Sequence, residues 1–238
     1  YRAELLGAIK SHRLNHEIYI TQKKGDATQV VAQRASEFDV VVAVGGDGTI
    51  LEVVNGLRGQ DAALGLVPIG TGNDFARGCG VPFNDVEGAM AVLLADQAKC
   101  IDLGEVNGRL FMNMLGLGFA GRGNQIAHCL PRFLGKLKYF LSVLLTFIIY
   151  RRSVVTIHFD DHQLKEPLFL ANIANGPYTG GGMTVNPKAN MTSSTLELAY
   201  MPALTRLKFL RYLSKLFDGS IAAVPEISYF YSQEFILQ

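Results

Sequence analysis

Short apolar runs alternate with helical patterns over the first hundred residues of the chain. Runs at 17–21, 39–44 and 63–68 predict strands, and apolar positions three and four residues apart predict helices at 27–36, 49–57 and 85–95. The run at 39–44 (DVVVAV) is rich in β-branched residues, which predicts a parallel strand buried on both faces. This alternation predicts a parallel sheet with helices on its faces.

The pattern changes at about Ile101. Apolar runs at 101–106, 109–114, 154–159, 168–174, 196–201 and 234–237 predict further strands, and glycine and asparagine turns separate many of them. Such spacing favours a second domain built largely of antiparallel sheet. We also expect a basic helix at 204–217. The chain should therefore be an α/β protein of two domains, 1–102 and 103–238.

The segment 137–150 (LKYFLSVLLTFIIY) is almost entirely apolar. A membrane-spanning helix needs about 20 apolar residues, so this segment is too short to span. The pattern fits a buried helix, and it also fits a helix that lays one face onto a bilayer. Basic residues that would suit anionic headgroups bracket it, which predicts peripheral association with anionic membranes. They are Arg132, Lys136, Lys138, Arg151 and Arg152.

Composition narrows the function classes. With 22 Lys and Arg against 21 Asp and Glu, the net charge of +1 gives no whole-chain case for nucleic-acid binding. A hydrophobic fraction of 49% argues against disorder. The 3 cysteines have no metal-ligand spacing, which predicts buried thiols in a reducing, cytoplasmic compartment.

The strongest chemical signal is a glycine turn, Gly45-Gly46-Asp47-Gly48-Thr49, between an expected strand and an expected helix. Glycine lets backbone amides approach a phosphate, and the helix N-terminus adds positive potential. The Asp47 carboxylate would repel phosphates unless a metal intervened, so it fits a ligand of Mg²⁺. Thr49 could cap the helix or bind a phosphate oxygen. Taken alone, the motif could also be an ordinary tight turn.

A second glycine turn, Gly70-Thr71-Gly72-Asn73-Asp74, follows the next expected strand. Two such turns at the ends of successive parallel strands would lie side by side at the edge of the sheet where open α/β folds bind ligands. Thr71 offers a hydroxyl to a phosphate or ribose. Asn73 could contact a nucleotide, but we favour a role as helix cap. Glu52, one helical turn beyond Thr49, could cap or border the site.

Together, AVGGDGTILEVVNGL and GLVPIGTGNDFAR resemble the catalytic domain of the diacylglycerol-kinase-like lipid kinases. Sphingosine kinases share the resemblance broadly, and NAD kinases share only GGDG. The resemblance extends over nearly the whole chain, through IDLG, FMNM, GLGF, ANG and GGG. It implies a Rossmann-like parallel-sheet domain plus a mainly antiparallel β-sandwich domain, with ATP bound between them. The implied reaction transfers the γ-phosphate to the hydroxyl of a membrane lipid, most directly diacylglycerol.

The resemblance also implies an ATP and Mg²⁺ site, with Asp47 as both catalytic residue and metal ligand. The implied nucleotide-binding residues are Thr21, Gly45, Gly46, Asp47, Gly48, Thr49, Ile50, Glu52, Gly70, Thr71, Gly72 and Asn73.

Departures from the family pattern keep alternatives open. Bacterial members hold a structural Mg²⁺ with an Asp where this chain has Ser193, and a hydroxyl is a poor substitute. We expect the loop 190–195 to bind no metal and to be held by its own turn hydrogen bonds. The family's general base is a Glu that we expect beyond Gln238. An NAD kinase-like enzyme, or a non-catalytic nucleotide- or lipid-binding protein, remains an alternative, and a homodimer is possible.

Overall fold

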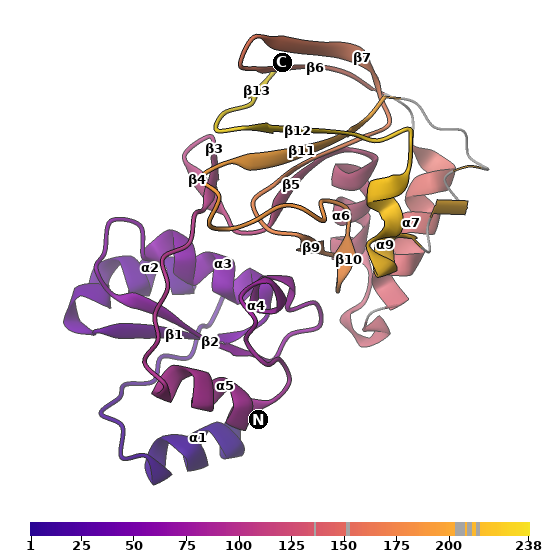
Figure 1. The fold of residues 1–238 in the computed structure, drawn as a ribbon. Helices are drawn as coiled ribbons and strands as arrows, with labels where there is room; N and C mark the ends of the chain where they lie inside the picture. The colour runs from indigo at the N-terminus through magenta and orange to yellow at the C-terminus, as the bar shows by residue number, and fades with distance from the viewer. Residues whose placement is uncertain (136, 151–152, 203–207, 209–210, 213–214) are drawn as a thin grey trace. The chain divides into compact units, whose positions relative to one another are not determined.

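Figure 1 shows the computed structural model of the chain, which describes all residues except 136, 151–152, 203–207, 209–210 and 213–214. Its contacts divide the chain into two units, 1–100 with 105–110, and 101–104 with 111–238. The predicted basic helix at 204–217 falls largely outside the described residues, and its last part is the short helix α9 (Lys215–Asp218).

The first unit is a two-stranded parallel sheet with helices packed on it. Its elements are α1 (Arg2–Ser11), α2 (Asp26–Arg34), η1 (Ala35–Glu37), β1 (Val40–Gly45), α3 (Asp47–Gly56), β2 (Ala63–Pro68), α4 (Asp74–Gly78), α5 (Val86–Leu94) and most of the hairpin formed by β3 (Gly104–Val106) and β4 (Arg109–Phe111). Strands β1 and β2 pair in parallel from Val40 opposite Ala63 to Gly45 opposite Pro68. The parallel sheet is therefore confirmed, and both strands end at the glycine turns.

The prediction that β1 is buried on both faces is wrong. Ala43 is buried, but Val40, Val42 and Val44 on the alternate face are 40–43% exposed. Within the described residues β1 hydrogen-bonds to β2 alone, so it lies at a sheet edge where the packed helices cover that face only in part.

No strand forms at 17–21, contrary to prediction. Ile18, Tyr19 and Ile20 are each more than half exposed and have no strand partner among the described residues. A strand needs a neighbour to satisfy its backbone donors and acceptors, so an apolar run alone does not make one.

The second unit is a β-sandwich with helices. Its elements are β5 (Met114–Gly118), α6 (Phe119–Cys129), η2 (Arg132–Leu134), α7 (Leu137–Ile149), β6 (Ser153–Phe159), β7 (His162–Leu168), β8 (Leu170–Ala174), β9 (Tyr178–Thr179), β10 (Met183–Thr184), β11 (Leu196–Met201), α9 (Lys215–Asp218), η3 (Ser220–Ala223), β12 (Ser228–Ser232) and β13 (Ile236–Leu237). The predicted strand at 109–114 is instead divided between β4 and β5, and that at 101–106 is reduced to β3.

Two antiparallel sheets form the sandwich, which confirms that prediction. One has the order β12-β11-β8-β5 and the other β13-β6-β7. Alternate residues of β8 and β11, among them Ile173 and Leu198, pack against Ile157 and Phe159 of β6 in a core between the sheets.

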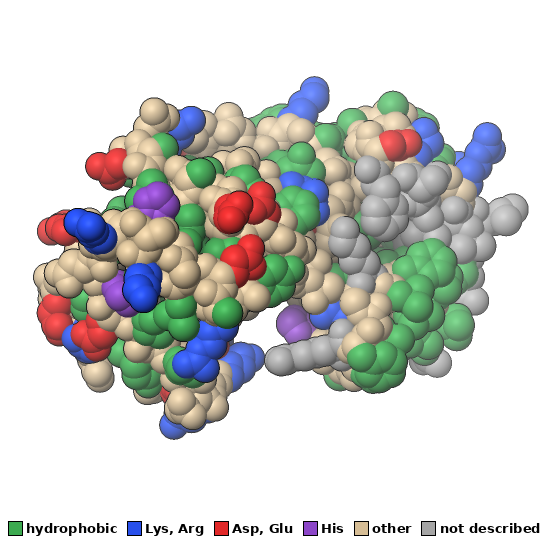
Figure 2. All heavy atoms as spheres, turned by 90° about the horizontal axis from the view of Figure 1, so that it is seen from below, with side chains coloured by type: hydrophobic (Ala, Val, Ile, Leu, Met, Phe, Trp, Pro, Cys, Tyr) green, Lys and Arg blue, Asp and Glu red, His purple; other side chains and the backbone are tan. Residues whose placement is uncertain are grey.

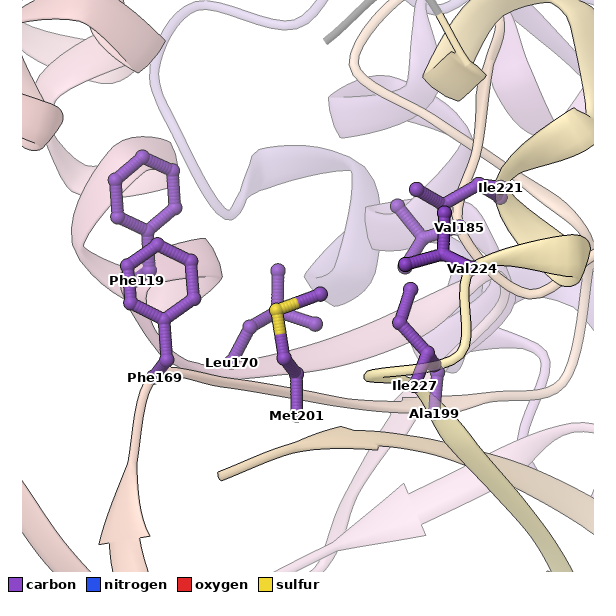
Figure 3. Close-up of a cluster of buried hydrophobic side chains, with 9 residues drawn as sticks. All are labelled: Phe119, Phe169, Leu170, Val185, Ala199, Met201, Ile221, Val224 and Ile227. Carbon is purple, nitrogen blue, oxygen red and sulfur yellow. The ribbon is translucent and has the colours of Figure 1, made fainter. Parts of the chain in front are cut away.

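The opposite face of the four-stranded sheet packs against helices. Leu170, Ala199 and Met201 point from the sheet into this second core. In Figure 3, Phe119 and Phe169 lie together at one end of the cluster, where their rings stack with centroids 5.0 Å apart. Partly buried side chains of α7 and α9 complete it.

All three cysteines are exposed, so the prediction of buried thiols is wrong. Cys79 follows α4, Cys100 lies in the segment after α5, and Cys129 ends α6. These helix ends and connections are solvent-facing positions.

Candidate functional site

The two predicted glycine turns contact one another through their backbones. A Cβ added to Gly70 would lie 2.3 Å from the Cα of Gly46, and a Cβ added to Gly46 would lie 3.0 Å from the Cα of Gly70. Ile69 N–H donates to the Gly45 carbonyl over 3.0 Å, which continues the strand pairing into the turns. The prediction that the turns lie side by side is confirmed, and their approach requires the absence of side chains.

The first turn opens helix α3 with backbone donors at its N-terminus. The Gly46 carbonyl accepts from Thr49 N–H at 2.9 Å and from Ile50 N–H at 3.1 Å. The first amides of a helix have no partner within it, so those of Asp47 and Gly48 remain for a ligand or solvent. A Cβ on Gly48 would meet nothing within 4 Å, which leaves room for a ligand.

Asp47 links the two turns. Its Oδ1 accepts a hydrogen bond of 3.0 Å from the Phe75 N–H in the first turn of α4. The carboxylate is therefore fixed beside the α3 N-terminus by one oxygen.

Asn73 occupies the residue before α4, but its side chain does not cap that helix, so the cap prediction is wrong. Its φ of +54° is left-handed, and its amide group turns back on Gly70, accepting from N–H and donating to C=O, both at 2.9 Å. Because Asn73 is fully buried and stabilises its own turn, the capping oxygen comes from Asp47 instead.

Two further predicted site residues have structural roles. Ile50 is fully buried and its amide donates to the Gly46 carbonyl, so its side chain packs in the core and its contact with the nucleotide stays a prediction. Glu52 Oε1 accepts from Gly25 N–H at 2.9 Å, which caps α2. In this structure α3 therefore uses Ile50 for packing and Glu52 for holding the start of α2.

The remaining predicted residues surround these turns or lie near α2. Thr49 folds back over Gly45, where a Cβ would meet its Oγ1 at 2.7 Å. Thr71 is exposed and Gly72 is buried. Thr21 is exposed just before a turn in which Asp26 Oδ2 accepts from the amides of Gln22 and Lys23. Sequence reasoning gave Asp26 no role.

A metal at this site would depend on Asp47. No group of three or more His, Cys, Asp or Glu side chains suited to a metal occurs in the part of the chain that the structure describes. One carboxylate is nevertheless compatible with Mg²⁺ that arrives on a nucleotide, because this ion keeps several waters and is often held by one or two carboxylates plus phosphates. The donor set thus fits Mg²⁺ carried by ATP.

The loop 190–195 in the second unit is held by its own hydrogen bonds, as predicted. Ser193 Oγ lies 2.8 Å from the carbonyl of Asn190 and 3.0 Å from that of Thr195. Asp102 also holds the loop, since its Oδ2 accepts from Ser194 N–H at 2.8 Å. Sequence reasoning missed this contact because 92 positions separate the two residues.

Family models match both units. Residues 2–106 match the diacylglycerol kinase catalytic domain. Residues 113–238 match the YegS C-terminal NAD kinase beta sandwich-like domain, which is more than half of the chain.

Individual relatives agree with these matches. A diacylglycerol kinase of Bacillus subtilis is 32% identical over 91% of this chain and 73% of its own length. A Pseudomonas aeruginosa protein named "Probable lipid kinase YegS-like" is 37% identical over 78% of this chain, which spans only 62% of that relative.

Solved structures share the fold. Two crystal structures of proteins from Bacillus anthracis each cover 99% of this chain. One, named a "putative diacylglycerol kinase", superposes with a TM-score of 0.83 at 27% sequence identity. The other, named a diacylglycerol kinase, superposes with a TM-score of 0.73 at 25% sequence identity. This chain therefore belongs to the family of diacylglycerol kinases and YegS-like lipid kinases.

Proposed function

We propose that the protein transfers the γ-phosphate of ATP to the hydroxyl of a lipid, with diacylglycerol as the acceptor. The observation that carries the proposal is the backbone contact of the two glycine turns, with the Asp47 carboxylate fixed between them. Family membership supports the same reaction class.

The described residues have distinct tasks in this proposal. The amides of Asp47 and Gly48 donate to phosphate oxygens at the positive end of α3. Phosphoryl transfer depends on positioning and on neutralising phosphate charge more than on covalent chemistry by the protein. Asp47, held by Phe75 N–H, keeps the phosphate loop aligned with the Gly70 turn.

Mg²⁺ bound with ATP would neutralise phosphate charge, and Asp47 is the residue that would hold it. The carboxylate would otherwise repel the nucleotide. ATP binding should therefore require Mg²⁺ more strongly in the unmodified protein than in Asp47→Asn.

The test is phosphate transfer from radiolabelled ATP to detergent-dispersed lipids by the full protein. We expect labelled phosphatidic acid from diacylglycerol, and a loss of at least about a hundredfold in Asp47→Asn, as for a group that stabilises transition-state charge. Asparagine retains the oxygen that accepts from Phe75 N–H, so circular dichroism and melting temperature should stay close to those of the unmodified protein.

Other outcomes would contradict the proposal. Label appearing in NAD rather than in any lipid would indicate an NAD kinase-like enzyme. Binding of ATP without label in any acceptor would indicate a non-catalytic protein. Label in another lipid alone would reject diacylglycerol while retaining the reaction class.

A further inference from the structure

Helix α7 packs Val143 and Phe147 against the core, buries two polar side chains and exposes large apolar ones, whereas an ordinary surface helix turns polar residues outward. Ser142 and Thr146 are 4% and 0% exposed. The outward side chains are far more accessible: Leu137 at 53%, Phe140 at 46%, Leu145 at 42%, Ile148 at 66% and Ile149 at 51%. We call this surface, with the neighbouring Phe133 at 87%, the α7 apolar face.

The two buried hydroxyl groups of α7 both donate hydrogen bonds to backbone carbonyls of the same helix. Ser142 Oγ donates to the Tyr139 carbonyl at 2.7 Å, and Thr146 Oγ1 donates to the Ser142 carbonyl at 2.6 Å. A Cβ on the buried Gly123 of α6 would lie 3.5 Å from Thr146 Oγ1. The two helices thus meet at the small residues Gly123 and Thr146, the kind of contact that lets helix pairs pack closely.

The neighbouring helix α6 has the ordinary polarity. Its outward residues Arg122, Asn124, Gln125 and His128 are exposed and polar, whereas Gly123 and Ala127 are buried. An apolar exterior is therefore specific to α7 within this helix pair. Figure 2 shows a broad hydrophobic area on the side of the second unit where α7 lies in Figure 1.

The segment of the sequence that contains α7 carries positive charges only. The chain has 21 Asp and Glu residues, yet none occurs between Glu105 and Asp160. That stretch holds Arg109, Arg122, Arg132, Lys136, Lys138, Arg151 and Arg152. Five of these lie within 132–152, although Lys136, Arg151, Arg152 and the side chain of Arg132 fall outside the described residues. The sequence therefore places cations before and after α7 along a chain whose net charge is only +1.

We propose that the α7 apolar face docks onto the surface of an anionic lipid bilayer. A 13-residue helix is about 20 Å long, enough to lie in the interface but too short to span the hydrocarbon. No helix among the described residues has the length and hydropathy of a membrane span. Apolar side chains enter the headgroup boundary while flanking cations contact anionic headgroups.

A second copy of the chain is a poorer occupant of this face. A two-fold dimer joins the same patch of both subunits, so it would bring together two copies of the segment 132–152, which holds five cations and no acidic residue. An anionic bilayer supplies the opposite charge. The inference rests on the proposed function only in that a lipid kinase must meet its substrate at a bilayer.

The test is vesicle flotation of the full protein carrying Phe140→Ser, Ile148→Ser or both. The matched control is Val92→Ser, which replaces a 44% exposed apolar residue on a helix of the other unit. We expect the unmodified protein and the control to bind vesicles of phosphatidylcholine with phosphatidylglycerol, and binding to fall with salt. Each α7 substitution should weaken binding by about tenfold.

Normal binding by the double variant, or absence of binding by the unmodified protein, would overturn the inference. So would equal binding to pure phosphatidylcholine, or a dimer in sedimentation experiments that the double variant abolishes. Phosphorylation of a short-chain lipid dissolved as monomers should survive in the double variant, because a substrate in solution needs no docking surface. If flotation follows expectation but no lipid is phosphorylated, the proposed function fails and the docking surface stands.

Discussion

At the scale of single residues, two glycines of the candidate site have opposite surroundings. Gly70 has no room for a side chain because the Gly46 backbone would lie 2.3 Å from its Cβ, whereas Gly48 faces open space. Gly70→Ala should therefore cost about 1–3 kcal/mol of unfolding free energy. Gly48→Val should change stability by only about 0.5 kcal/mol but weaken ATP binding by at least about tenfold.

Urea denaturation and calorimetric ATP titration of both variants provide the measurement. Gly46→Val is a less selective probe, because its side chain would crowd Gly70 as well as a phosphate. Unchanged ATP affinity in folded Gly48→Val would contradict the assignment of this turn to phosphate.

Ser193 has two carbonyl oxygens beside its hydroxyl, so a carboxylate at this position would be repelled unless a cation bound there. Its Oγ is close to the carbonyls of Asn190 and Thr195, so Ser193→Asp would bring negative charge against two acceptors. Without metal we expect a loss on the order of 1 kcal/mol. Millimolar Mg²⁺ should restore the stability of Ser193→Asp. Its melting temperature should rise by roughly 2–4 °C for each kcal/mol of Mg²⁺ binding free energy.

Melting curves with Mg²⁺ and with chelator check this prediction, in an Asp47→Asn background that removes the carboxylate of the nucleotide site. Ser193→Asn has similar size without charge and should not respond to Mg²⁺. A response of equal size in the protein with Ser193 intact would mean that the loop binds metal already.

At the scale of elements, Asn55 on α3 fastens the hairpin β3–β4. Its Oδ1 accepts from Leu110 N–H at 3.0 Å, and its Nδ2 lies 3.2 Å from the Leu110 carbonyl, so the side chain acts like one residue of a neighbouring strand. Asn55→Ala should cost about 1–3 kcal/mol because both backbone groups lose their partner.

Hydrogen exchange checks this directly, since the Leu110 amide should exchange faster in the variant. ATP affinity should not change, because the Asn55 contacts involve the hairpin and not the glycine turns. Loss of ATP binding together with the hairpin would show instead that β3–β4 supports the nucleotide site.

At the scale of the whole molecule, each of the two units has its own core. Val67, Val86 and Met90 cluster in the first, and the sandwich cores lie within the second. Independent cores favour two thermal transitions. ATP with Mg²⁺ should raise only the transition that Gly70→Ala lowers, because a ligand stabilises the unit that it binds. Scanning calorimetry with and without nucleotide tests this, and one joint transition that shifts as a whole would refute it.

The sequence by itself determined the framework of the site. The strand at 63–68 has the predicted bounds, and β1 differs from prediction by one residue at each end. Because parallel strands end at the same sheet edge, local spacing sufficed to bring the Gly46 and Gly70 turns together. Of β5 only Met114 was predicted, and strands β7 and β12 and helix α6 were not predicted: α6 is rich in glycine, and β7 carries mostly polar residues and Pro167.

Only the tertiary structure decided what individual side chains do. Asp47 and Glu52 cap helices other than their own, and those partners lie 28 and 27 positions away in the chain. Local propensity contains no information on such distant donors. Periodicity predicted a helix at 137–150, but an almost wholly apolar segment gives no signal for its outward face. Packing of Thr146 against Gly123 of α6, and of Val143 and Phe147 against the second core, decided that orientation. The same packing leaves Phe140 and Ile148 exposed.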